Sequence, residues 1–397
     1  MYSQPSHLKN LSYKDRQILI EILINRSTHL DRMSDAQLKH QITQLLIEKY
    51  SRHRLSLAER KNFTKQIFDS IRGFDILQKL LDNPRITEIM VNGPEHIYIE
   101  ENGRLSLTPL RFEDRNHLVQ VICRFFGRAN KLINETSPIA GMRLADGSRI
   151  HAVLPPAAPD GPCLSIRRFT GIKPDLNSLI ACGTIDQEAA KFLVDSVRNK
   201  QSIFVSGGTG TGKTTFLNAL SAFIPKQERI ITIEDSPELD LKLDNVVRLE
   251  SRPAGPSGQG EVSLESLIKS SLRLRPDRII VGEIRGGEAL EMIQAMSTGH
   301  PGSMSTGHGN SCQEMVERIC LLMLMNSHLP WDAVRRLTAS ALDLVVQLER
   351  LPNGQRIVRE ISRLDGYKQQ QLLFTPLFIR RDQRLVLVDK CNTKLEG

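Results

Sequence analysis

A glycine-rich segment in the middle of the chain is the strongest candidate for chemistry. It is Gly207-Gly208-Thr209-Gly210-Thr211-Gly212-Lys213-Thr214, which matches the phosphate-loop pattern G-x-x-x-x-G-K-[ST]. Glycines let the main chain approach phosphates closely, and the loop N–H groups and the positive end of the next helix attract anions. In this pattern the lysine contacts the β- and γ-phosphates and the hydroxyl residue is a ligand of Mg²⁺. We therefore expect Lys213, Thr214 and Thr215 to bind a nucleoside triphosphate with its Mg²⁺.

The sequence on either side of this segment supports the phosphate loop over the alternative, a glycine-rich surface turn. The β-rich run Ile203-Phe204-Val205 precedes it, and a helical pattern from Lys213 to Phe223 follows, which is the strand–loop–helix context of a phosphate loop. Guanine is disfavoured because the chain has no N/T-K-x-D element: Asn199-Lys200-Gln201-Ser202 lacks the aspartate. ATP is the expected nucleotide.

Acidic residues follow two other predicted strands. The apolar run 279–281 leads to Gly282 and Glu283, and a carboxylate at such a strand end can hold Mg²⁺ through water or orient the attacking water. The run 230–233 leads to Glu234, Asp235 and Glu238, three candidates for the base that activates water. Ligands bind at the carboxyl edge of open α/β sheets, so both groups are expected there. A solvated loop remains the alternative for each group.

Two histidines in a glycine-rich stretch are further candidates. His300 and His308 are eight residues apart, which is not a helical metal-ligand spacing. Contact with the γ-phosphate or with the catalytic base is the more plausible role, and a plain hydrogen-bonded loop histidine is the alternative. None of the six cysteines forms a C-x-x-C pair, so no zinc is expected.

Four arginines precede the predicted ATPase domain. They are Arg143, Arg149, Arg167 and Arg168. Guanidinium groups suit polyphosphates, and arginines that accelerate hydrolysis often come from another domain or subunit. Ordinary surface charge is the alternative for each of them.

The periodicity divides the chain into three predicted parts. Residues 1–70 have apolar residues at helical spacing and form a helical N-terminal extension, and residues 71–170 alternate short strands, hairpin turns and a helix, as in a mixed α/β domain. Residues 170–175 have the composition of a linker. Residues 171–397 alternate strands with helices, which predicts a parallel-rich sheet covered on both faces.

Composition limits the partners. The net charge of +8 suits nucleic acid, anionic lipid or a phosphate-rich ligand, but aromatics make up only 5% of the chain, which makes nucleic acid unlikely. The first ten residues have no apolar core, and no uncharged apolar stretch approaches the length that spans a bilayer. A cytoplasmic location is expected.

The order of these motifs resembles one superfamily. A phosphate loop, a Glu-Asp segment, a Gly-Glu segment and two histidines follow one another as in the secretion and pilus ATPases. The similarity is greatest to the tight-adherence (Flp-type, CpaF-type) pilus assembly ATPases. It extends to residues 88–93 and 143–149, and covers roughly residues 70–365.

This resemblance implies a RecA-like P-loop NTPase domain that works as a homo-hexameric ring. The ring would hydrolyse ATP with Mg²⁺ at the inner face of the plasma membrane, against an inner-membrane platform protein, and so power pilus assembly or secretion. Glu283 would be the Walker B acid and Glu238 the catalytic glutamate of the "Asp box". His300 and His308 would form the "His box". The chain lacks the four-cysteine zinc insert of some branches, which favours the tight-adherence or type IV secretion branches; a DNA-translocating ATPase is the alternative.

Overall fold

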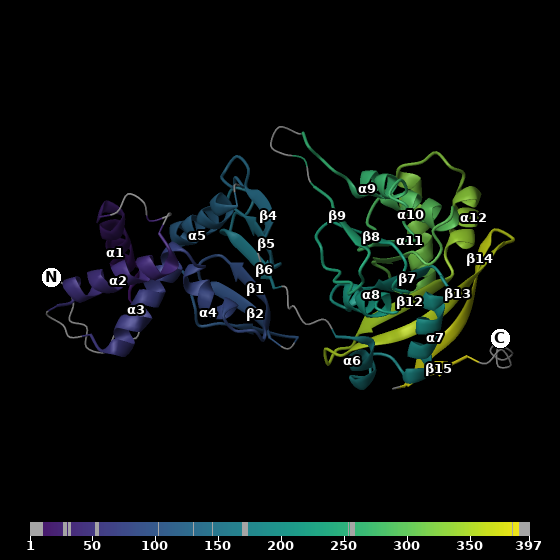
Figure 1. Ribbon diagram of the computed structural model, residues 1–397, viewed down its shortest axis with the longest axis horizontal. Helices are drawn as coiled ribbons and strands as arrows, with labels where there is room; N and C mark the ends of the chain where they lie inside the picture. The colour runs from purple at the N-terminus through teal and green to yellow at the C-terminus, as the bar shows by residue number, and fades with distance from the viewer. Residues whose placement is uncertain are drawn as a thin grey trace. The chain divides into compact units, whose positions relative to one another are not determined.

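The computed structural model describes residues 11–388, except 27–29, 31–32, 52–54, 102, 130, 145, 169–173, 253, 255–258 and 383. The chain forms two compact units, Met1–Gly171 and Ile172–Gly397, shown in Figure 1. Most of the predicted linker and Cys391 lie outside the described residues. The predicted boundary at residue 70 falls inside the first unit and stays a prediction.

The N-terminal unit begins with a helical bundle. Its helices are α1 Tyr13–Arg26, α2 Asp35–Lys49 and α3 Leu57–Ile71. Leucine, isoleucine and phenylalanine side chains at helical spacing meet in one small core, among them Leu19, Leu38 and Phe63. Capping boxes start α2 at Ser34 and α3 at Ser56, so the first N–H groups of both helices have partners.

A six-stranded antiparallel sheet forms the rest of this unit, in the order β3-β2-β1-β6-β5-β4. The elements are η2 Asp75–Leu77, α4 Gln78–Leu81, β1 Ile86–Asn92, β2 His96–Glu101, β3 Arg104–Leu107, α5 Arg115–Arg128, β4 Ile139–Arg143, β5 Arg149–Val153 and β6 Cys163–Arg167. Leu118, Ile122 and Phe125 of α5 pack against alternate strand residues such as Ile89 and Ile166 in one apolar core. The opposite face of the sheet carries the remaining, more polar residues, because side chains alternate along a strand.

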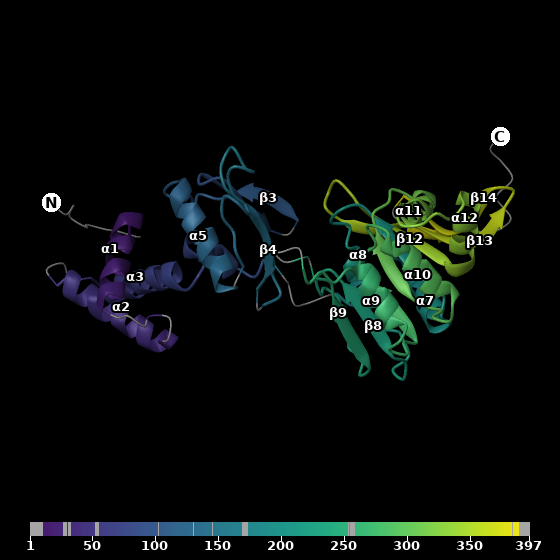
Figure 2. The same cartoon turned by 90° about the horizontal axis from the view of Figure 1, so that it is seen from above.

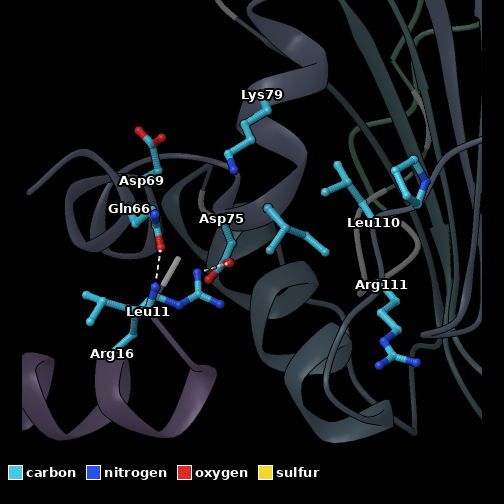
Figure 3. A pocket seen from close by; sticks show the side chains of 10 residues that line it. Leu11, Arg16, Gln66, Asp69, Asp75, Lys79, Leu110 and Arg111 are labelled. Atoms are coloured by element: carbon cyan, nitrogen blue, oxygen red, sulfur yellow. Dashed lines mark hydrogen bonds and ion pairs between the residues drawn. The ribbon is translucent and has the colours of Figure 1, made fainter. Parts of the chain in front are cut away.

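A buried charge cluster joins α1 to the α/β part of this unit (Figure 3). Arg16 Nη1 donates to Asp75 Oδ1 at 2.9 Å, as Figure 3 shows. His117 Nε2 lies 3.4 Å from Asp75 Oδ2. Tyr13 stacks on the His117 ring with centroids 3.8 Å apart. Burial alone would raise the pKa of Asp75, but the His117 contact and the Arg16 charge hold it well below the ordinary range. These charges neutralise one another inside the fold.

The C-terminal unit contains a nine-stranded sheet in the described residues, in the order β15-β14-β13-β12-β7-β11-β10-β8-β9. Its strands are β7 Ile203–Gly207, β8 Ile230–Glu234, β9 Val246–Glu250, β10 Arg278–Val281, β11 Met304–Gly307, β12 Leu344–Arg350, β13 Arg356–Lys368, β14 Gln371–Arg381 and β15 Arg384–Leu387. The strands from β12 to β9 are parallel, and β13, β14 and β15 extend the sheet antiparallel. The predicted parallel-rich sheet is confirmed.

Helices cover both faces of this sheet (Figures 1 and 2). They are α6 Leu176–Ala181, α7 Gln187–Arg198, α8 Lys213–Ser221, α9 Leu264–Ser271, α10 Glu288–Ser297, α11 Cys312–Met325 and α12 Trp331–Ala341. The first three pack on the face that carries Ile203 and Val205, and the other four pack on the face that carries Phe204. Both faces of the central strands are buried, which explains their continuous apolar sequences.

Candidate functional site

Four predicted motifs meet at the carboxyl edge of the parallel strands. The phosphate loop follows β7, His308 follows β11, Glu283 lies two residues after β10, and Glu234 ends β8. These strands are neighbours in the sheet and run in the same direction. Their carboxyl ends therefore bring the four motifs side by side, as predicted for an open parallel sheet.

The loop itself requires its glycines. Gly210 and Gly212 have φ of +74° and +92°, a left-handed conformation that other residues adopt at a cost. A Cβ on Gly207 would lie 2.8 Å from the carbonyl oxygen of Leu348, so the neighbouring strand leaves room only for hydrogen there. Gly208 and Thr209 are exposed. Thr211 donates its hydroxyl to the Gly208 carbonyl at 2.9 Å.

Lys213 is buried and folded back over the loop. Its Nζ donates to the carbonyl oxygens of Gly207 and Gly208, each at 2.9 Å, and lies 3.4 Å from His308 Nδ1. Carbonyl dipoles are weak partners for a full positive charge compared with an anion. The ammonium group is thus held at the loop in a position where a phosphate oxygen would be a stronger partner.

His308 links the loop to Glu283. His308 Nε2 lies 2.8 Å from Glu283 Oε1, although this contact lacks hydrogen-bond geometry. Burial, followed by the charge of Lys213, lowers the pKa of His308, so the imidazole is neutral at neutral pH. A neutral ring can accept from Lys213 on one nitrogen while facing the carboxylate with the other.

Arg285 also contacts this carboxylate, and it was not identified from the sequence. Its guanidinium donates to Glu283 Oε2 at 2.9 Å and 2.5 Å and lies 3.6 Å from Asp235 Oδ2. The hydrogen bond to Glu283 raises the pKa of Arg285. Arg285 therefore connects the acids after β10 with those after β8. A sequence signal was available, since an arginine two residues after a strand-end acid lies at the same edge.

Glu234 and Glu238, two of the candidate bases, differ in their surroundings. Glu234 is buried and its Oε1 accepts from the main-chain N–H groups of Glu238 and Leu239, at 2.8 and 3.0 Å. A Cβ on Gly282 would come within 2.9 Å of the Glu234 side chain, which explains the glycine at that position. Glu234 thus organises the turn that presents Glu238, while Asp235 is exposed and accepts from the Ser251 hydroxyl. This favours Glu238 over Glu234 for contact with a water.

The structure does not bring His300 to this edge. His300 precedes β11, and its Nδ1 lies 3.3 Å from the Ala295 carbonyl at the end of α10. Its own carbonyl accepts from Ser303, whose hydroxyl in turn accepts from the N–H of Ile279 in β10. His300 therefore lies at the amino edge of the sheet, while His308 lies at the other end of β11. Within this unit His308 lies beside Lys213 and His300 does not, and a role toward nucleotide stays a prediction for both histidines.

The four candidate arginines lie in the N-terminal unit. Arg143, Arg149 and Arg167 are directly opposite one another on β4, β5 and β6, so they share one face of that sheet. Arg143 donates to the Gly147 carbonyl at 3.1 Å. Arg168 is turned to the main chain and donates to the carbonyls of Asn83 and Ile86. A role toward nucleotide stays a prediction for all four.

The arrangement suits a Mg²⁺ ion. Glu283 Oε1 is buried and accepts no hydrogen bond from any of the described residues, so it has unused capacity for a water ligand of a cation. Thr214 is half-buried in the first turn of α8, next to the loop. A hydroxyl and a carboxylate are oxygen ligands of the kind that Mg²⁺ takes together with phosphate oxygens. Thr214 and Glu283 would hold the ion, which would neutralise charge on the phosphates.

These features define a class: a phosphate-loop nucleotide-binding unit of RecA-like fold. A family described as "Type II/IV secretion system protein" matches residues 71–373. The chain belongs to that family.

Relatives from several bacteria are similar over most of the chain. A putative conjugal transfer protein of Mycobacterium tuberculosis is 34% identical over 300 residues, which are 74% of this chain and 85% of that protein. The conjugal transfer protein TrbB of Rhizobium radiobacter is 31% identical, over 79% and 93% of the two chains. The type IV secretion system protein VirB11 of Brucella suis is 32% identical, over 68% and 83%.

Solved structures share the fold. The Legionella pneumophila ATPase DotB superposes with a TM-score of 0.52 at 19% identity, covering 75% of this chain and 81% of DotB. The pilus retraction motor PilT with bound ADP gives 0.51 at 19% identity, covering 75% and 83%. At this identity the likeness concerns the fold alone. A separate observation is that none of the helices in the described residues combines the length and the apolar character needed to cross a bilayer.

Proposed function

We propose that this chain is an ATPase that hydrolyses ATP with Mg²⁺ at the carboxyl edge of its parallel sheet. The observation that carries the proposal is the continuous set of contacts from Lys213 through His308 to Glu283 beside the glycine loop. Lys213 binds the β- and γ-phosphates. Glu283 orients the water shell of the metal, and Glu238 is the candidate that takes a proton from the attacking water.

The proposed assembly is a homo-hexameric ring in the cytoplasm, docked on an inner-membrane platform protein. The resemblance of the motifs favours Flp-type pilus assembly. The names of relatives such as TrbB and VirB11 favour a second candidate, a type IV secretion or conjugal transfer ATPase. We also propose that residues 1–70, 71–170 and 171–397 are a helical extension, an α/β domain and the ATPase domain.

Hydrolysis by the purified full chain tests the enzymatic claim. We expect phosphate release from ATP in the presence of Mg²⁺, its loss with EDTA, and at least a hundredfold decrease in Lys213→Ala, because the phosphates lose their main cation. Lys226→Ala, an exposed lysine just after α8, is the matched control and should keep wild-type turnover. Turnover of Lys213→Ala equal to that of the wild type would refute the proposal.

A pulldown distinguishes the two machines. Lys213→Ala protein retained on membranes would be recovered together with its membrane partner. Co-purification of a pilus platform protein would support the Flp-type assignment. Recovery of conjugation or secretion-channel components would support the type IV assignment instead.

A further inference from the structure

A cavity of about 240 Å³ lies beside the phosphate loop, within the C-terminal unit. It is bounded by α6, by the first turn of α8 and by the hairpin that joins β12 to β13. Leu179, Phe216 and Leu348 give it apolar walls, while Thr184 and Gln355 add polar atoms. An apolar cavity with a few polar groups is the usual form of a site for a flat organic group such as a nucleobase.

One charged side chain faces this cavity. Of the described residues that line it, Arg356 carries a charge and none is acidic. Arg356 Nε donates to the carbonyl oxygen of Gly210 at 2.9 Å, so the side chain lies across the loop. A Cβ on Gly212 would be 3.2 Å from Arg356 Cδ, and the absence of that Cβ lets the arginine approach.

A second arginine is directly opposite Arg356. Arg350 and Arg356 are paired across β12 and β13, and a Cβ on Gly210 would lie 3.3 Å from Arg350 Nη1. Like charges on facing positions of neighbouring strands repel each other. An anion near both guanidinium groups would relieve that repulsion, and the phosphate loop beside them is the place where an anion binds.

The cavity and the catalytic contacts involve different parts of the loop. Lys213, His308 and Glu283 mark the position of the terminal phosphates, and none of these three lines the cavity. The cavity is lined instead by Thr211, Gly212 and Thr215. A nucleotide with its terminal phosphates at Lys213 would therefore extend its nucleoside end toward Arg356.

We propose that Arg356 binds the α-phosphate of the nucleotide and that the cavity receives the attached nucleoside. The inference rests on the proposed ATPase function and adds a positioning residue from the β12–β13 hairpin. Arg356 exchanges its hydrogen bond to the neutral Gly210 carbonyl for a stronger one to an anionic phosphate oxygen. Because the α-phosphate is common to ATP and ADP, Arg356 contributes equally to the binding of both and does not act on the reacting γ-phosphate.

Isothermal titration with ADP and with a non-hydrolysable ATP analogue tests this role. We expect Arg356→Gln to raise the Kd of both ligands by roughly tenfold, with their ratio unchanged. Arg359→Gln is the matched control, since Arg359 is an exposed arginine on the same strand whose contact is Glu349 at 3.7 Å. It should bind both ligands as the wild type does.

Other outcomes overturn the inference. Unchanged affinity in Arg356→Gln would show that the arginine does not contact nucleotide, and weakening for the ATP analogue alone would place it at the γ-phosphate. Arg356→Lys provides a second variant if the glutamine protein does not fold, and it should weaken both ligands to a smaller extent. If the wild-type chain binds neither ligand, the proposed function itself fails, which separates the two claims.

Discussion

Two clusters of charged side chains show how similar residues serve different purposes in the two units. In the N-terminal unit, Arg16 and Asp75 have side-chain exposures of 9% and 1%, and the Asp75 carboxylate lies against both Arg16 and His117. In the C-terminal unit, His308 and Glu283 are 37% and 18% exposed, and Lys213 has main-chain carbonyls as partners. The first cluster holds helices together, and the second gathers a lysine, a histidine and a carboxylate beside the phosphate loop.

Position in the fold explains the difference. The Arg16–Asp75 pair joins segments 59 residues apart between helices that pack through their sides. The Lys213–Glu283 cluster lies where parallel strands end, next to main-chain N–H groups of a glycine loop that have no strand partner. A buried ion pair is weak evidence for function, whereas charges gathered at strand ends beside a phosphate loop are stronger evidence.

Of the variants that compare the two clusters, the one at Glu283 is expected to have the largest effect, a loss of ATP turnover. Glu283→Gln keeps the shape of the side chain but removes its charge, so turnover should fall a hundredfold or more while nucleotide binding changes only a few-fold. Steady-state hydrolysis and titration with ADP measure the two quantities. Asp244→Asn, an exposed acid of the same unit, is the control. Full turnover in Glu283→Gln would show that the Lys213–Glu283 cluster is structural, like the Arg16–Asp75 cluster.

The converse change in the N-terminal unit should affect stability. Asp75→Asn leaves Arg16 with a buried charge that lacks its anionic partner, so unfolding in urea at pH 7 should require about 3 kcal/mol less free energy. Asp82→Asn breaks an exposed pair with Lys65 and should cost less than about 1 kcal/mol. If the two variants lose equal stability, the buried cluster has no special structural role.

Replacement of Asp69, near the Arg16–Asp75 cluster, is expected to change stability by a smaller amount and in the opposite direction. Burial raises the pKa of Asp69 to about 6 from 3.8, so the folded state disfavours the ionised carboxylate. Ionisation between about pH 4 and 6 therefore costs stability, and the full cost is present above pH 6. Asp69→Asn should stabilise the protein at pH 7.5 by on the order of 1 kcal/mol and should have no such benefit at pH 4.

Thermal or urea unfolding at the two pH values measures this dependence. Glu21→Gln, an exposed acid on α1, should show no difference between them. A stabilisation by Asp69→Asn that is as large at pH 4 as at pH 7.5 would mean that the carboxylate is not desolvated.

The sequence predicted those parts of the site that depend on local pattern. An apolar run followed by glycines or acids identifies a strand end, so the loop and the acids at 234 and 283 were placed at one edge without knowledge of strand order. The separation of His300 from His308 could not be predicted, because the histidine spacing does not show that the short strand β11 lies between the two residues. The contact of Arg356 with Gly210 could not be predicted, because it depends on β12 pairing with β7 across more than a hundred residues.

For the fold, too, features set by local sequence pattern were predicted and features set by contacts between distant residues were not. Alternation of strands and helices predicted the parallel sheet, and Asn353-Gly354, which lies between β12 and β13, is a sequence typical of hairpin turns. Helix α6 was not predicted, since its six residues directly follow Asp175, the last residue of the predicted linker. The Arg16–Asp75–His117 cluster was also missed, because polar residues on separate helices give no periodic signal of their pairing.

Nucleotide binding is the most direct test of the central claim that the edge at Lys213 is a triphosphate site. Equilibrium titration of the wild-type chain and of Lys213→Ala with ADP and Mg²⁺ would measure it, with thermal unfolding as a check on the fold. We predict saturable binding of one nucleotide per chain that is lost in Lys213→Ala, while the unfolding midpoint without nucleotide is unchanged. Equal binding by the two proteins, or none by the wild type, would contradict the account.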